Sequence, residues 1–172
     1  MTAGCAPGMA LRGCALRREG FTLLEMVIAV AILSVLVVMA VPVVKLELQR
    51  QKETQLRESL RDLRNAIDAY KRAVDDGRIL RKAEATGYPP HIEDLVRGVP
   101  DARDPKKQRT LFFLRRIPRD PFNDDANMPA ADTWGLRSYA STAEDPSTGD
   151  DVFDVYSMSP GVGLNGVPYR QW

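Results

Sequence analysis

Apolar residues run almost without interruption from position 21 to position 44, and the charged residues of the chain, apart from Glu25, lie on either side of this segment. Its 24 residues are enough to cross a hydrocarbon core of about 30 Å as a helix. Arg12, Arg17 and Arg18 precede it, so the positive-inside rule places the start of the chain in the cytoplasm and the remainder outside. We therefore predict a single-pass membrane helix.

After position 44 the pattern changes to one apolar residue every three or four positions. The members of this stripe are Leu56, Leu60, Leu63, Ile67, Tyr70 and Val74. Such spacing predicts one face of an α-helix, and Gly77 is a natural stop. We predict a continuous helix over residues 21–76, loosened at Pro42 because proline lacks an N–H and crowds the carbonyl of Val38. The stripe is expected to cover a C-terminal domain, and a coiled coil is the alternative.

Oppositely charged residues four positions apart follow the same predicted helix. They form the pairs Glu53 with Arg57, Arg64 with Asp68, and Asp68 with Arg72. On an exposed helix face each such pair contributes only a few tenths of a kcal/mol. We expect all three pairs on the solvent side of the helix.

Proline and glycine punctuate residues 77–172, which indicates irregular connections. A short helix is predicted over residues 91–99, while residues 110–117 are too basic and mixed to assign. Residues 133–141 and 152–157 carry aromatic and β-branched side chains and are separated by a turn-rich segment, which predicts an antiparallel hairpin. The predicted fold class is α+β, with a long N-terminal helix packed on a small antiparallel sheet.

Composition and motifs exclude several kinds of function. The formal net charge of +1 argues against a nucleic-acid binder. Cys5 and Cys14 both precede the apolar segment, so a chain without its leader has no thiol for a disulfide, a metal or catalysis. The one histidine, His91, follows a proline pair and suits a helix start or the surface better than a catalytic base. Residues 161–166 fit G-x-G-x-x-G, but only six residues follow them, so we expect a loop.

The sequence RREGFTLLEMVIAVAILSVLVVMAVP, residues 17–42, resembles the class III leader and first helix of type IV pilins and pseudopilins. The resemblance implies that a prepilin peptidase cuts between Gly20 and Phe21 and methylates Phe21. It also implies that Glu25 is the acid used in filament assembly and Pro42 the proline that breaks the helix. A generic signal anchor is the alternative, but a carboxylate inside a membrane segment costs about 2.5–3.5 kcal/mol. Met9 is an alternative start to Met1.

Later segments sharpen the resemblance. GYPPHIEDLV, RRIPRDPFND and DVFDVYSMSPGVGLNGVPYRQW look like parts of the major pseudopilins of type II secretion systems. The family implies a leader over 1–20, a membrane and polymerisation helix over 21–44, an amphipathic periplasmic helix over 45–76, and a small periplasmic α+β domain over 77–172. In this family a proline-rich turn near Asp120 feeds the sheet.

The resemblance implies a structural subunit of a periplasmic pseudopilus that drives protein export, not an enzyme. The implied partners are the prepilin peptidase, further copies of the chain, minor pseudopilins, an inner-membrane platform and an assembly ATPase. The implied location is the bacterial inner membrane, with the C-terminal domain in the periplasm. A minor pseudopilin or a type IV pilin for adhesion, motility or DNA uptake is one alternative. A membrane-tethered periplasmic domain that never polymerises is another.

Calcium is the cofactor that such major pseudopilins commonly bind, in the loop after the last strand. A hard cation needs oxygen ligands, and residues 157–172 contain no carboxylate side chain. We therefore expect no metal or other cofactor. A relocated calcium site is the alternative, built from the aspartates at positions 124, 125, 150, 151 and 154.

Overall fold

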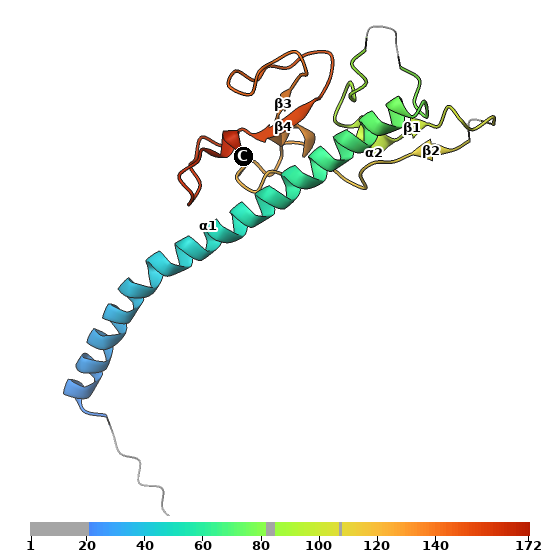
Figure 1. Cartoon of the computed structure of the whole chain (residues 1–172). Coiled ribbons are helices and arrows are strands. Elements are labelled where there is room, and N and C mark those ends of the chain that lie inside the picture. Colours follow the sequence, from blue (N-terminus) through green and yellow to red (C-terminus); the bar gives the residue numbers. More distant parts are fainter. Residues whose placement is uncertain (1–20, 82–84, 107) are drawn as a thin grey trace, which may run out of the picture. The chain divides into compact units, whose positions relative to one another are not determined.

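The computed structural model describes residues 21–81, 85–106 and 108–172 and, for residues 39–43, the backbone alone. The chain divides into two compact units, Met1–Val43 and Val44–Trp172. Helix α1, Leu23–Asp75, begins in the first unit and continues into the second, close to the predicted 21–76 (Figure 1). No helix among the described residues combines the length and the apolar character needed to cross a membrane.

The part of α1 in the second unit buries the predicted stripe. All six predicted positions are at most 9% exposed, and Leu56, Leu63 and Ile67 are fully buried. Two hydrogen bonds close the C-terminal end of the helix, from the Gly77 N–H to the Val74 carbonyl and from the Arg78 N–H to the Ala73 carbonyl. Gly77 supplies the positive φ of 69° that this helix ending requires. The stripe and its stop are confirmed.

The segment after α1 differs from its prediction. Helix α2 covers Asp94–Arg97 alone, so the helix expected over residues 91–99 is wrong at both ends. Gly98 has φ 82°, which ends the helix, and the chain continues as β1, Val99–Pro100. Strand β1 pairs antiparallel with β2, Thr110–Leu111, within the segment that the sequence left unassigned.

The predicted hairpin is present in shorter form. Strand β3, Trp134–Arg137, pairs antiparallel with β4, Asp154–Ser157, with Trp134 opposite Ser157 and Arg137 opposite Asp154. A single 3₁₀ turn, η1, Ala131–Thr133, precedes β3, and a second, η2, Tyr169–Gln171, lies near the C-terminus. The turn expected around Asp120 is confirmed, because its carboxylate accepts a hydrogen bond from the Phe122 N–H at 2.8 Å.

One hydrophobic cluster joins the helix stripe to the rest of the second unit. It includes Trp134 of β3, Val155 of β4, Leu95 of α2 and Tyr169 of η2. Figure 1 shows the β3–β4 hairpin beside the C-terminal half of α1. The fold is therefore α+β, with a long helix and small antiparallel sheets, as the sequence predicts.

Two of the predicted helix charge pairs are arranged differently. Glu53 does lie 3.6 Å from Arg57, but it is 3% exposed rather than on the solvent side. Arg64 donates to Asp154 at 2.7 Å, across 90 residues of sequence, in place of the expected Asp68. The hairpin supplies a carboxylate that is held in place by the fold, which a neighbouring exposed side chain on the helix cannot match.

Candidate assembly site at the start of the long helix

The first turn of α1 is held by a local hydrogen bond. The Thr22 hydroxyl oxygen accepts from the Glu25 N–H at 3.2 Å, so Thr22 caps the helix that begins at Leu23. The spacing Thr-x-x-Glu is the sequence signature of such a cap, and it is a signal that the sequence analysis did not use. The acid in this turn also suits the positive end of the helix dipole. Glu25 is thus held in the first turn of α1, four residues after Phe21.

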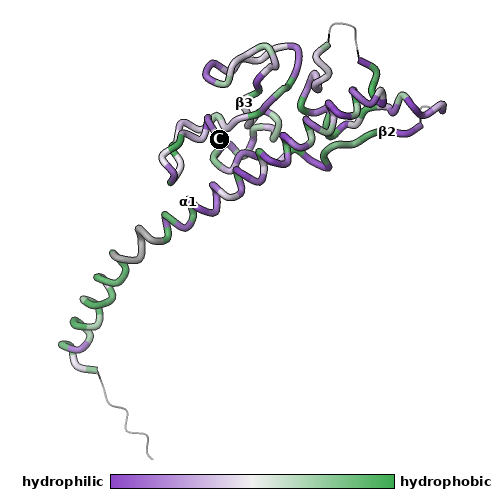
Figure 2. Tube along the Cα trace, viewed as in Figure 1, coloured by the Kyte–Doolittle hydropathy of each residue, from purple (hydrophilic) through white to green (hydrophobic). Residues whose placement is uncertain are grey.

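The first unit presents apolar side chains to its surroundings. Phe21 is 75% exposed, and large apolar residues from Leu23 to Val38 are half exposed or more. Figure 2 shows hydrophobic residues along this described part of α1. The Ser34 hydroxyl donates to the Ala31 carbonyl at 2.8 Å, so this polar group is satisfied inside the helix. An apolar surface of this extent is typical of a segment that binds lipid or other helices.

The structure describes some, but not all, of the four residues that the sequence assigns to processing and assembly. Phe21 lies two residues before α1 and Glu25 lies in its first turn, and both side chains are exposed. Gly20 lies outside the described residues, as do the rest of the predicted leader, Met9 and both cysteines. Pro42 lies within α1, where its side chain is not described, so the expected loosening of the helix stays a prediction.

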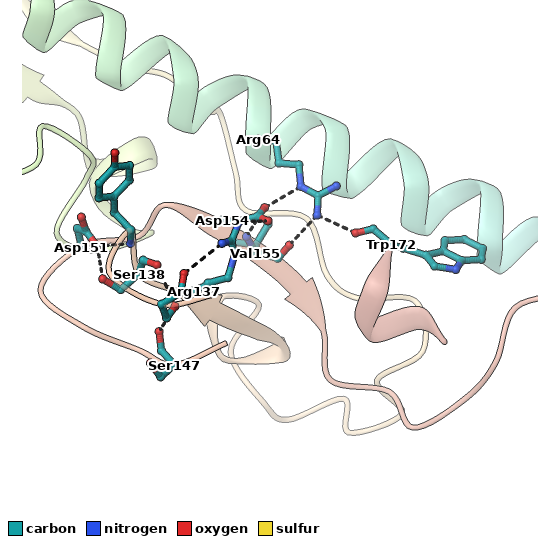
Figure 3. A network of polar contacts seen from close by, with 10 residues as sticks. Arg64, Arg137, Ser138, Ser147, Asp151, Asp154, Val155 and Trp172 are labelled. Atoms are coloured by element: carbon teal, nitrogen blue, oxygen red, sulfur yellow. Dashed lines mark hydrogen bonds and ion pairs between the residues drawn. The ribbon is translucent and has the colours of Figure 1, made fainter. Parts of the chain in front are cut away.

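Two of the five aspartates considered for calcium, Asp151 and Asp154, are engaged by other groups of the protein. Asp154 lies between two guanidinium groups, 2.7 Å from Arg64 and 3.1 Å from Arg137, and is not the solvated position that its place in a strand suggests (Figure 3). Asp151 is buried and accepts hydrogen bonds from the Ser138 hydroxyl at 2.6 Å and from Thr86. Each carboxylate is therefore neutralised or saturated by donors of the protein.

The electrostatics of Asp151 follow from these contacts. Burial alone raises the pKa of its carboxyl group, but the hydrogen bonds from Ser138, Thr86 and the Tyr139 N–H outweigh it and the pKa is lowered. Asp124 lies 3.8 Å from Lys52 with a side chain that is 94% exposed. Within the part of the chain that the structure describes, no group of three or more histidine, cysteine, aspartate or glutamate side chains could hold a metal ion.

His91 and the G-x-G-x-x-G match at residues 161–166 both lie where the sequence predicts them. His91 is exposed and precedes α2, as expected for a residue at a helix start. Residues 161–166 form a loop, in which the Gly166 N–H donates to the Gly163 carbonyl at 2.9 Å. The three-residue turn η2 follows it, which is too short to serve as the phosphate-binding helix of a dinucleotide site.

Comparisons with known proteins concern both units. The prokaryotic N-terminal methylation motif matches residues 16–41, which include Gly20, Phe21 and Glu25. The chain is also similar to proteins named type II secretion system core protein G. The protein from Aeromonas hydrophila is 26% identical over 135 residues, which cover 78% of this chain and 89% of that protein. The protein from Klebsiella pneumoniae is 27% identical over 79% of this chain and 93% of its own length.

A third relative of the same name, from Pseudomonas aeruginosa, is 26% identical over 81% of this chain and 92% of its own length. No solved structure gives a significant match. Since the methylation motif ends at residue 41, alignments of 135 residues or more extend the similarity well into the second unit.

Proposed function

We infer that this chain is a type IV pilin-like pseudopilin, similar to the core protein G of type II secretion systems. We propose that it is a structural subunit of a periplasmic filament that drives protein export. Its role is structural and not enzymatic. The observation that carries the proposal is the combination of an N-terminal methylation motif with similarity to core protein G over 78% of the chain.

Processing would create the mature subunit. A prepilin peptidase would cut between Gly20 and Phe21 and methylate the new amine, which leaves 152 of the 172 residues. The apolar residues 21–44 would then anchor the subunit in the inner membrane, with residues 45–172 in the periplasm. The arginines before the apolar segment support this orientation, because positive charge is retained in the cytoplasm.

Assembly would use the exposed start of α1. In a filament the apolar helices of neighbouring subunits would exclude water, and an unpaired Glu25 carboxylate would become costly there. A cationic amine at Phe21 of an adjacent subunit would compensate for that cost, but only at one axial displacement between the two helices. Glu25 would therefore select the register of the incoming subunit. The pair would select the register rather than add much net stability, because buried ion pairs often only break even against apolar substitutes.

The remaining partners follow from the same proposal. An assembly ATPase and an inner-membrane platform would supply the work, because the sequence contains no P-loop. Minor pseudopilins would complete the filament. With a net charge of +1, no nucleic-acid partner is proposed.

Glu25→Gln tests the proposal, because it keeps the shape of the side chain and removes its charge. We expect the variant to be inserted and cleaved, but to form no filaments. Secretion should fall below about a tenth of the wild-type level, since leaving one partner of a buried ion pair alone costs about 3–5 kcal/mol. The readouts are processing on immunoblots, filaments by electron microscopy, and secreted protein in the medium.

Glu58→Gln is the matched control, because Glu58 is an exposed acid further along α1. It should assemble and secrete normally. Assembly and secretion by Glu25→Gln at the wild-type level would mean that Glu25 is only a tolerated acid, and the register mechanism would be wrong.

A further inference from the structure

The C-terminal loop, residues 158–172, folds back on itself and onto α1. Within the loop, an isolated antiparallel bridge joins Val162 to Pro168, and the Gly163 N–H donates to the Val167 carbonyl at 2.9 Å. The Trp172 carbonyl accepts from the Arg64 guanidinium at 2.7 Å, which fastens the end of the loop to the helix (Figure 3). The loop is thus an ordered part of the second unit, although it contains no long strand or helix.

The Glu53 carboxylate lies at the centre of this loop's contact with α1. One of its oxygens, Oε1, accepts hydrogen bonds from the Leu164 N–H at 2.8 Å, the Tyr169 hydroxyl at 3.0 Å and Gln49 Nε2 at 3.2 Å. The other, Oε2, lies 3.6 Å from the Arg57 guanidinium. The residue is 3% exposed. A single side chain of the helix therefore gathers two donors that lie more than a hundred residues away in sequence.

Aromatic contacts enclose the same carboxylate. The Tyr169 ring stacks on Phe122 with the ring centres 4.1 Å apart and meets the edge of Trp172 at 5.0 Å. The Arg57 guanidinium lies 4.2 Å from the centre of the Trp172 ring. Burial raises the pKa of the Tyr169 hydroxyl, so it stays protonated and can donate to Glu53. These rings keep water from the hydrogen bonds and so strengthen them.

This arrangement has the opposite polarity to a cation site. A calcium site surrounds a central positive charge with six to eight oxygen ligands. Here a central negative charge is surrounded by N–H and O–H donors and a guanidinium, and the loop supplies no carboxylate side chain. The residues present therefore do not fit the calcium that the resemblance to major pseudopilins implies for this loop.

We infer that the Glu53 carboxylate holds the C-terminal loop on α1 through the hydrogen bonds it accepts, and that this loop folds without the calcium that the resemblance implies. The inference goes beyond filament building and does not depend on it. It predicts that the folded subunit is indifferent to calcium and dependent on Glu53. Glu53→Gln keeps the size of the side chain and one acceptor oxygen, but it removes the negative charge on which the donors converge and turns an NH2 group toward the Arg57 guanidinium.

The experiment uses the full chain in detergent, with thermal unfolding followed by tryptophan fluorescence and with amide hydrogen exchange of the peptide that contains Leu164. Wild-type melting curves in millimolar calcium and in chelator should overlay. Glu53→Gln should lower the Tm by about 5 °C or more in both conditions, and the Leu164 amide should exchange at least about tenfold faster. Glu58→Gln, on the exposed side of the same helix, should change neither quantity.

Tyr169→Phe covers the case in which Glu53→Gln does not accumulate in cells. It removes one donor from the same carboxylate and should lower the Tm by a smaller amount, again without any response to calcium. A wild-type Tm that rises by several degrees with calcium overturns the inference, because a ligand that binds only the folded state stabilises it. Unchanged Tm and exchange in both Glu53→Gln and Tyr169→Phe overturn it as well. None of these readouts requires filaments or secretion, so failure here is distinct from failure of the proposed function.

Discussion

Thr22 and Glu25 determine where α1 begins through chemistry that is local in sequence. The Thr22 hydroxyl accepts from the Glu25 N–H, and this bond satisfies one of the donors that every helix start leaves free. The Glu25 N–H therefore contributes to the helix cap, while its carboxylate, by our proposal, pairs with the amine of a neighbouring Phe21. Cleavage directly before Phe21 would leave the cap intact, because Thr22 remains in the mature chain.

Gly20 carries a prediction at the same scale. A residue without a side chain before the cut lets the backbone enter a narrow peptidase site, so Gly20→Val should block processing and leave the precursor in the membrane. Immunoblots that separate precursor from mature chain measure this directly. Gly13→Val, seven residues earlier in the leader, is the control and should be cleaved normally. Efficient cleavage of Gly20→Val would move the processing site elsewhere.

Buried polar residues were the least predictable from sequence. The predicted pair of Glu53 with Arg57 is present, but the expected exposure of Glu53 was wrong, because Leu164 and Tyr169, more than a hundred residues away, donate to its carboxylate. Arg64 likewise pairs with Asp154 across 90 residues. Charge spacing along a helix reveals neighbours within one turn and carries no information about contacts that only the tertiary fold creates.

At the scale of elements, the long helix was predicted almost to the residue and the short strands were not. A stripe repeated over several turns is a strong local signal, and Gly77 marks its end. Strand β3 ends four residues earlier than expected, because the Ser138 N–H turns to the Ser147 carbonyl and the Tyr139 N–H to Asp151. Strands β1 and β2 have two residues each, too few to show an alternating pattern.

Gly98 tests the junction between α2 and β1. Its φ of 82° disfavours any side chain, and a Cβ there would lie 2.6 Å from the Thr110 methyl group of β2. Gly98→Ala should therefore lower the free energy of unfolding by about 2–3 kcal/mol, from backbone strain together with the clash. Urea unfolding followed by tryptophan fluorescence provides the measurement.

Gly166→Ala separates the two causes. Gly166 has a similar φ of 79°, but a Cβ there would meet nothing within 4 Å. This variant should lose only the strain contribution, about 1–2 kcal/mol. Equal losses in the two variants would mean that the Thr110 contact plays no part at the junction.

At the scale of the whole molecule, the two units differ in how far their apolar side chains are buried. The second unit buries the stripe of α1 against its sheet and loop, so its hydrophobic core is complete within one chain. The first unit leaves large apolar side chains exposed, from Phe21 to Val38. The proposed membrane anchor and filament would cover this surface, first with lipid and then with other helices.

Whether the processed chain builds a filament can be measured from the mass of the subunit in isolated filaments. Cells would overproduce the full chain together with its processing peptidase, the inner-membrane platform and the assembly ATPase. Filaments would be collected by sedimentation and checked by electron microscopy. The account predicts filaments whose subunit is the 152-residue chain that begins at a methylated Phe21. Recovery of the processed chain solely as monomers, or of filaments whose subunit begins at another residue, would contradict it.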